Sequence, residues 1–149
     1  MLKRALIISA MSMALVGCAG APLGLDLGQK PMAGTWKGTY LCPNLKLTRQ
    51  DVVMTLQDGR VPGSVNGVVE MNFVYAGQKN YMKYTVVGSN VGGHFVAKGK
   101  QILQTTRSDF TMGPISGNMP DSDTIMAEGC GRLHALKRVS STAQQTAQR

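Results

Sequence analysis

The chain has 149 residues, with 16 lysines and arginines against 8 aspartates and glutamates, giving a formal net charge of +8. The length suits one domain with a single hydrophobic core. The basic residues are scattered along the chain, which argues against nucleic-acid binding, because that function needs a focused basic patch.

The first predicted element is an export signal at residues 1–17. Lys3 and Arg4 give it a positive start, and residues 5–16 form an uncharged, mostly apolar run. Small residues follow, as in a secretory signal peptide, and the run is short for a membrane-spanning helix. A retained membrane anchor and a buried helix are the alternative interpretations.

The run ends in Leu15-Val16-Gly17-Cys18, which resembles the lipobox of bacterial lipoproteins. The resemblance implies cleavage before Cys18, a diacylglycerol on its thiol and acylation of its new amino group. Two or more acyl chains anchor a protein stably, whereas one binds a membrane only marginally. Because Ala19 rather than Asp follows, the resemblance implies the outer membrane, facing the periplasm, rather than the inner membrane. No cofactor is expected apart from this covalent lipid.

Acylation of Cys18 leaves two thiols, Cys42 and Cys130. In an oxidising periplasm these two residues are expected to form a disulfide. A metal pair and a catalytic thiol are the competing interpretations. Only His94 and His134 are available as imidazole ligands and no Cys-x-x-Cys spacing occurs, so no metal is expected.

The mature chain divides into three parts by composition. Residues 18–32 carry the lipidated cysteine and a tether rich in Gly, Ala and Pro. Residues 33–139 are expected to be the folded domain, and residues 140–149 a polar, disordered tail.

Within the folded domain, apolar residues recur with a period of two, which is typical of half-buried antiparallel strands. The clearest case is residues 64–75, where one face carries Val65, Val69, Met71, Phe73 and Tyr75 and the other carries Ser64, Asn66, Glu70 and Asn72. The expected strands, in chain order, cover residues 35–42, 51–57, 64–75, 81–87, 95–98, 101–106, 110–112, 124–130 and 133–139.

Two details of these strands are predicted as well. Residues 95–98 and 101–106 are expected to pair around a turn at Gly99-Lys100. Leu133 and Leu136 cannot both face inward from a regular strand, so a bulge near Gly129 or Gly131 is expected. The sequence therefore predicts an all-β fold, a small antiparallel barrel or sandwich of about eight strands without helices, whose first and last strands are joined by the disulfide.

Gly34-Thr35-Trp36 resembles the Gly-x-Trp that opens lipocalins, avidins and related calycin barrels. The resemblance implies that Trp36 lies on the barrel floor under a basic residue of the last strand, either Arg138 or Lys137.

A closer resemblance covers residues 34–138. G-T-W-K-G-T-Y-L-C near the start and E-G-C-G-R-L-H-A-L-K-R at the end are similar to a family of small exported bacterial β-domains with the pattern Trp-x-Gly-x-Tyr-x-Cys. That family implies the fold and the disulfide but no assigned activity. Periplasmic lysozyme inhibitors are also similar at Tyr40-Leu41-Cys42. Their inhibitory loop has no counterpart here, and residues 78–81 are the nearest candidate.

No catalytic constellation is evident, so the protein is not expected to be an enzyme. The candidate bases His94 and His134 and the candidate nucleophiles Ser89 and Ser116 have no spacing that recommends them. Asp121-Ser122-Asp123 is more typical of a turn than of a cation site.

Six side chains could line a cavity, since an eight-stranded barrel is just wide enough for its own side chains or for one small ligand. They are Tyr40, Met54, Met71, Phe73, Met82 and Tyr84. The alternative is that they fill the core. The sequence thus predicts a membrane-anchored, non-catalytic binding or interaction module of the cell envelope, with an unidentified envelope protein as partner. The alternatives are a calycin-like carrier of a small hydrophobic ligand and an inhibitor of a cell-wall hydrolase such as lysozyme.

Overall fold

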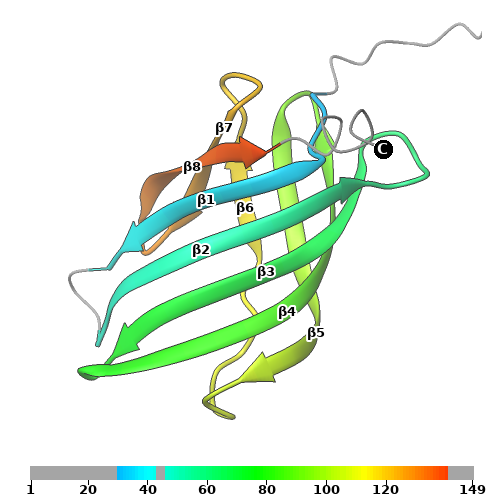
Figure 1. Ribbon diagram of the computed structural model, residues 1–149. Coiled ribbons are helices and arrows are strands. Elements are labelled where there is room, and N and C mark those ends of the chain that lie inside the picture. Colours follow the sequence, from blue (N-terminus) through cyan, green and yellow to red (C-terminus); the bar gives the residue numbers. More distant parts are fainter. Residues whose placement is uncertain (1–29, 43–45, 141–149) are drawn as a thin grey trace, which may run out of the picture.

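The computed structural model describes residues 30–42 and 46–140, in which eight strands form one closed antiparallel barrel (Figure 1). The strands are β1 (Gly34–Leu41), β2 (Leu47–Asp58), β3 (Ser64–Tyr75), β4 (Gln78–Val91), β5 (His94–Thr105), β6 (Ile115–Asn118), β7 (Thr124–Gly129) and β8 (Arg132–Ser140). Each strand pairs with the next along the chain, and β8 pairs with β1 to close the barrel. The predicted all-β antiparallel barrel is confirmed. The predicted signal, Cys18 and residues 141–149 lie outside the described residues.

No helix occurs among residues 30–42 and 46–140, and so none that could cross a membrane.

The barrel forms because its strands carry one apolar face each. In β2 the side chains of Val52, Met54 and Leu56 are buried, while their neighbours along the strand are more exposed. β3 has the bounds that its alternation predicted, residues 64–75. In β4, residues 82, 84 and 86 point inward and are almost fully buried. The inward faces of all the strands meet in one core, which excludes water from apolar surface.

Three of the connections are two-residue turns in which both residues have positive φ, the type I′ geometry that matches the twist of a hairpin. They are Ala76-Gly77 between β3 and β4, Gly92-Gly93 between β4 and β5, and Cys130-Gly131 between β7 and β8.

β5 corrects one prediction. Residues 94–105 form one strand of 12 residues instead of two strands paired around Gly99-Lys100. The 14-residue β4 supplies a continuous partner along this whole length, with two register shifts that accommodate the extra residues. Gly99 does not form a turn. It makes room for the Met112 side chain, which lies where a Cβ on Gly99 would be.

Two further predictions about the last third of the chain are wrong. Residues 110–112 form no strand, and the strand of this region is β6, at residues 115–118. The pairing of β7 with β8 contains no bulge, because its register runs without a shift from Gly129–Arg132 to Thr124–Lys137. Leu133 and Leu136 do not both face inward. Leu136 is fully buried, while Leu133 faces solvent and is 57% exposed.

The predicted disulfide between Cys42 and Cys130 is confirmed. It connects the residue after β1 to the turn between β7 and β8, and its Cα atoms are 5.4 Å apart, within the usual range. The bridge therefore fastens the seam at which β1 meets the last hairpin.

The two ends of the barrel differ, and we call them the closed end and the mouth. β1 begins and β8 ends at the closed end, where Thr35 pairs with Ser140. β1 ends at the mouth, beside the disulfide, the β3–β4 and β7–β8 turns and the β5–β6 loop at residues 106–114. The described part of the chain thus enters and leaves the barrel at the end opposite the mouth (Figure 1).

Candidate functional site

The closed end is filled around Trp36, whose side chain is fully buried. Its indole Nε1 donates a hydrogen bond of 3.0 Å to the Met32 carbonyl oxygen. The guanidinium carbon of Arg138 lies 4.1 Å from the centre of the indole, a cation–π contact. Lys137 is turned away and donates to the Thr124 hydroxyl. Of the two basic residues considered for this place, Arg138 therefore covers the tryptophan.

Arg138 also ties three chain segments together at this end. It donates hydrogen bonds to the carbonyl oxygens of Pro31, Ala33 and Ser122, and its Nε lies 3.3 Å from Asp123 Oδ1. The planar guanidinium can serve several acceptors at once, which a lysine cannot do with the same geometry.

Residues 30–32, expected to belong to the tether, pack on the closed end. Met32 is fully buried and its N–H donates to Asp58 Oδ1 at 3.0 Å. The amide of Asn90 donates to the Lys30 carbonyl oxygen, and Lys30 Nζ donates to the carbonyl oxygen of Met119. The segment that precedes β1 thus seals the barrel floor.

The mouth half of the barrel contains a cavity of about 230 Å³. Five of the six side chains proposed from the sequence as cavity lining do line it, namely Tyr40, Met71, Phe73, Met82 and Tyr84. The sixth, Met54, is fully buried in the filled half and does not. The remaining lining comes from Leu47, Gln50, Val52, Phe110, Thr111, Gly113, Pro114, Ile115, Glu128, Gly129 and Cys130.

The cavity exists because the barrel wall is short of side chains on one side. β6 has four residues and pairs with β5 only at residues 94–97. The β5–β6 loop supplies the missing wall: the Phe110 ring lies 4.7 Å from the ring of Phe73 and 5.2 Å from that of Tyr75, centre to centre. Gly129, also in the lining, makes room for the Tyr40 ring, because a Cβ there would come within 2.8 Å of that ring.

The role of Phe110 is one that sequence reasoning missed. Its segment was predicted to be a strand, although Gly113-Pro114 follow closely and favour an irregular backbone. An apolar aromatic in such a loop is the signal that could have indicated a cavity wall.

Arg107 holds this loop from outside. Its guanidinium carbon lies 4.8 Å from the Tyr75 ring centre and 5.3 Å from that of Phe110. It also forms a hydrogen-bonded ion pair with Asp109. The hydrogen bond from Arg107 lowers the pKa of the Asp109 carboxyl. Its charge is therefore engaged at the rim and does not enter the cavity.

Two tyrosines, Tyr40 and Tyr84, are among the residues that line the cavity. The Tyr40 side chain stacks on His134 at 4.8 Å, and its hydroxyl is buried without a hydrogen-bond partner among the described residues. Burial raises the pKa of Tyr40 well above its usual value, and the neighbouring Tyr84 raises it further. Burial also raises the pKa of Tyr84 to about 12. Both side chains therefore carry their proton at neutral pH and act as hydrogen-bond donors.

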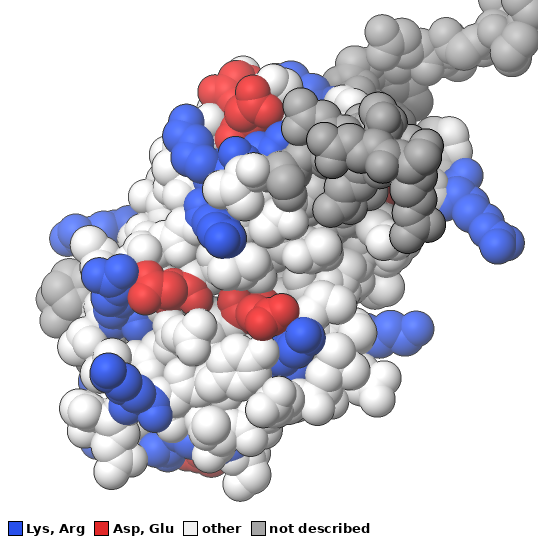
Figure 2. All heavy atoms as spheres, in the orientation of Figure 1, with Lys and Arg blue, Asp and Glu red and all other residues white. Residues whose placement is uncertain are grey.

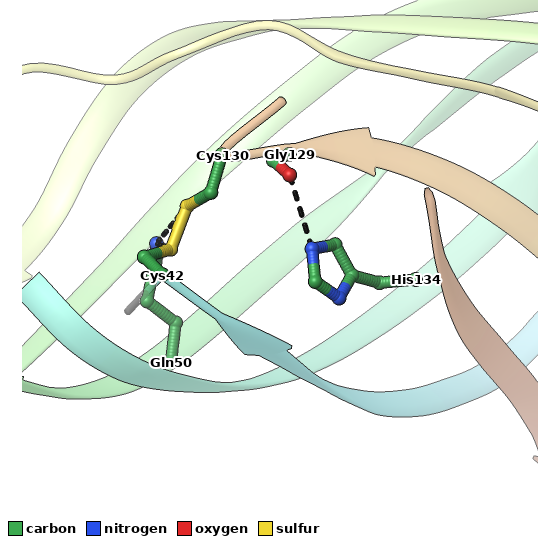
Figure 3. The surroundings of a disulfide bond; sticks show 5 residues. All are labelled: Cys42, Gln50, Gly129, Cys130 and His134. Atoms are coloured by element: carbon green, nitrogen blue, oxygen red, sulfur yellow. Dashed lines mark hydrogen bonds between the residues drawn. A yellow bond between two sulfur atoms is a disulfide. The ribbon is translucent and has the colours of Figure 1, made fainter. Parts of the chain in front are cut away.

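Cys130 of the disulfide lines the cavity. Figure 3 shows the bridge with Gln50, Gly129 and His134 around it. Gln50 points its amide at the sulfurs, with Nε2 3.4 Å from Cys42 Sγ and 3.8 Å from Cys130 Sγ. His134 Nε2 lies 3.0 Å from the Gly129 carbonyl oxygen, so this nitrogen carries the proton and donates. These contacts hold the disulfide and the β7–β8 turn in place at the rim.

The other candidate groups are not brought together. His94 bonds Asn118 near the closed end, whereas His134 lies near the mouth. Ser116 donates to Glu128 and is not oriented by either histidine. Within the described ranges, no group of three His, Cys, Asp or Glu residues could hold a metal ion. Residues 78–81, the nearest counterpart of an inhibitory loop, lie in β4 instead of a loop.

The surface charges are dispersed. Figure 2 shows lysine and arginine side chains spread over this face, with acidic side chains between them. On the outer face Arg49 pairs with Asp51 at 2.9 Å and Lys83 pairs with Glu70 at 3.1 Å. Hydrogen bonds from these basic partners lower the pKa of both carboxyls.

Comparisons of the chain with protein-family models, with curated proteins and with solved structures found no match. The case for a function therefore rests on the cavity and on the residues around it.

Proposed function

We propose that the protein is a non-catalytic binding module of the cell envelope that holds one small, mostly apolar molecule in the mouth cavity. The observation that carries this proposal is a cavity of about 230 Å³ inside an otherwise filled barrel. Protein interiors are close-packed, and voids larger than a water molecule are few in any domain. A concave space with a largely apolar lining and a few polar groups is the usual form of a small-molecule site.

The volume limits the occupant. An apolar cavity of about 150 Å³ accepts benzene, so this cavity suits a molecule of about ten non-hydrogen atoms. Pockets for drug-sized ligands start at about 300 Å³. A long acyl chain or a large ring system would therefore extend out of the mouth.

The lining suits an apolar ligand. Met71 and Met82 supply flexible, polarisable side chains from β3 and β4, and thioethers adapt to ligands of different shape. Phe73 and Phe110 add aromatic rings to the lining. A bound apolar molecule would gain dispersion contacts with these side chains.

We also propose, from the sequence, that a lipid on Cys18 anchors the protein at the outer membrane. The described chain enters at the closed end, so an anchor that precedes residue 30 would leave the mouth on the opposite side of the barrel. The ligand would then be exchanged with the periplasm or with an envelope protein. The envelope protein as partner, and inhibition of a cell-wall hydrolase, stay predictions from the sequence alone.

Methionine methyl NMR tests the proposal, because methionines lie both inside and outside the cavity. The full chain with ¹³C-labelled methionine methyls is titrated with α-methylstyrene, an apolar probe of nine non-hydrogen atoms. The Met71 and Met82 signals should shift in a saturable manner. The signals of Met32, Met54 and Met119, buried in the filled half, should change little.

Blocking the space supplies the matched control. Met71→Trp places a larger ring in the cavity and should abolish the saturable shift at Met82. Met126→Trp makes the same change on β7, where residue 126 alternates with the buried Ile125 and Ala127 and is absent from the lining. It should leave binding unchanged. If α-methylstyrene moves no methyl in the unaltered protein, the proposal is wrong.

A further inference from the structure

The chemistry of the ligand can be read from the polar groups that the mouth cavity leaves unpaired; this step rests on the proposed function. The Tyr40 side chain is 7% exposed, and its hydroxyl has no hydrogen-bond partner among the described residues. Most buried polar atoms in proteins are paired, and a buried hydroxyl without a partner lowers stability. Phenylalanine would fill the same space without that penalty. Tyr40 borders the cavity, so a molecule bound there would supply this partner once the groups that cover the hydroxyl shift.

Tyr84 offers a second donor to the same cavity. Its hydroxyl lies 3.6 Å from the Met71 sulfur, and a thioether is a weak acceptor. A hydrogen bond from the Tyr84 hydroxyl to a ligand oxygen would be stronger than its present contact with the Met71 sulfur. A carbonyl oxygen has two lone pairs and can accept from two hydroxyls at once.

The charge around the cavity excludes an ionised group at this position. The lining contains no lysine or arginine among the residues that the structure describes. Its one acidic residue, Glu128, is exposed at the rim and accepts a hydrogen bond from Ser116. Arg107, which packs on the Phe110 ring at the mouth, is paired with Asp109. A carboxylate buried here would lose its hydration without gaining a counter-charge, which is strongly unfavourable.

We infer that the ligand is a neutral carbonyl compound, such as a small ketone, ester, lactone or amide, whose oxygen accepts a hydrogen bond from the Tyr40 hydroxyl. Its hydrocarbon part lies against Met71, Met82 and Phe73. Tyr40 thus determines specificity for the carbonyl, while the apolar lining provides most of the affinity.

Three probes of nearly equal shape separate these contributions. Acetophenone carries the carbonyl, α-methylstyrene replaces its oxygen by a CH₂ group, and benzoate replaces its methyl by a charged oxygen. Binding of each to the full chain is measured from the Met71 and Met82 methyl shifts. Acetophenone should bind about tenfold more tightly than α-methylstyrene, the usual effect of one added hydrogen bond to a buried group. Benzoate should bind at least tenfold more weakly than acetophenone.

Tyr40→Phe removes the donor and keeps the ring. It should weaken acetophenone binding about tenfold and leave α-methylstyrene binding unchanged, so that the two probes become equal. The melting temperature without ligand should stay the same or rise, because the variant removes an unpaired polar atom. Tyr81→Phe is the matched control, since the Tyr81 hydroxyl donates to Glu70 on the outer face. It should change neither affinity.

The outcomes distinguish the two proposals. If neither neutral probe moves the cavity methyls, the proposed function fails. If both bind but Tyr40→Phe changes neither affinity, the cavity binds ligands and the inference about the carbonyl is wrong. If benzoate binds most tightly, the inference about charge is wrong.

Discussion

Removing the disulfide should cost the protein a large part of its stability. The bridge between Cys42 and Cys130 joins residues separated by 88 positions, and it encloses all of β2 to β7. In the double variant Cys42→Ala/Cys130→Ala the native contacts between the strands stay, but the unfolded chain gains the freedom that the bridge removed.

The magnitude follows from the length of the closed loop. A loop of this size corresponds to about 4–5 kcal/mol at 25 °C in the chain-entropy treatment. Small domains are stable by about 5–15 kcal/mol, so the variant should be folded only marginally. With a urea dependence of about 1–3 kcal/mol per molar, the midpoint of unfolding should fall by about 1.3–5 M.

Trp36 makes the measurement straightforward, because it is the only tryptophan and it is fully buried at the closed end, far from the substitutions. Urea unfolding is followed by its fluorescence in the unaltered protein, in each single variant and in the double variant. Each single variant should lose nearly as much stability as the double one, since either breaks the same bridge. A loss below about 1.5 kcal/mol in the double variant would refute the argument that the bridge acts by restricting the unfolded chain.

Three further results are expected. Arg138→Ala should lower the free energy of unfolding by about 3 kcal/mol in urea titrations, because it removes charged hydrogen bonds and the contact with Trp36; an effect below 1 kcal/mol would contradict this role. Gly117→Ala should cost about 2 kcal/mol or more, because its Cβ would lie 2.8 Å from the Ala127 Cα. The control Gly113→Ala, with no atom within 4 Å of the new Cβ, should be near neutral. Hydrogen bonds from Lys83 and then Tyr81 lower the pKa of Glu70 from its ordinary value of 4.5. Its contribution to stability should therefore be complete above about pH 4.5 and be lost as the pH falls through the lower folded-state value; a Glu70→Gln variant whose acid unfolding matches that of the parent would oppose this.

The alternation of side chains along the chain was sufficient to predict the fold class. A period of two requires strands with one buried face, and β3 has the bounds that the pattern in residues 64–75 indicated. The disulfide followed from the count of cysteines once Cys18 was assigned to lipid. The strand pattern depends on residues that are neighbours in sequence. The disulfide depends on the pairing of two thiols, which was predicted without knowing where they lie in the barrel.

Predictions failed where partners distant in sequence decide the local structure. Glycine at position 99 suggested a turn, but a continuous β4 partner keeps β5 extended, and the space at Gly99 receives Met112. Leu133 and Leu136 suggested a bulge, but the register with β7 places one outside and one inside without it.

The sequence by itself determined that an apolar interior would exist and which side chains would face it. Only the tertiary structure decided which half of that interior is filled. Met54 and Met71 occupy inward positions on adjacent strands, yet Met54 is packed between other core side chains and Met71 borders the cavity. The difference arises because β6 is short, so part of the wall around the cavity is built by the β5–β6 loop. Packing density at a point depends on all the strands that converge there, and no single stretch of sequence contains that information.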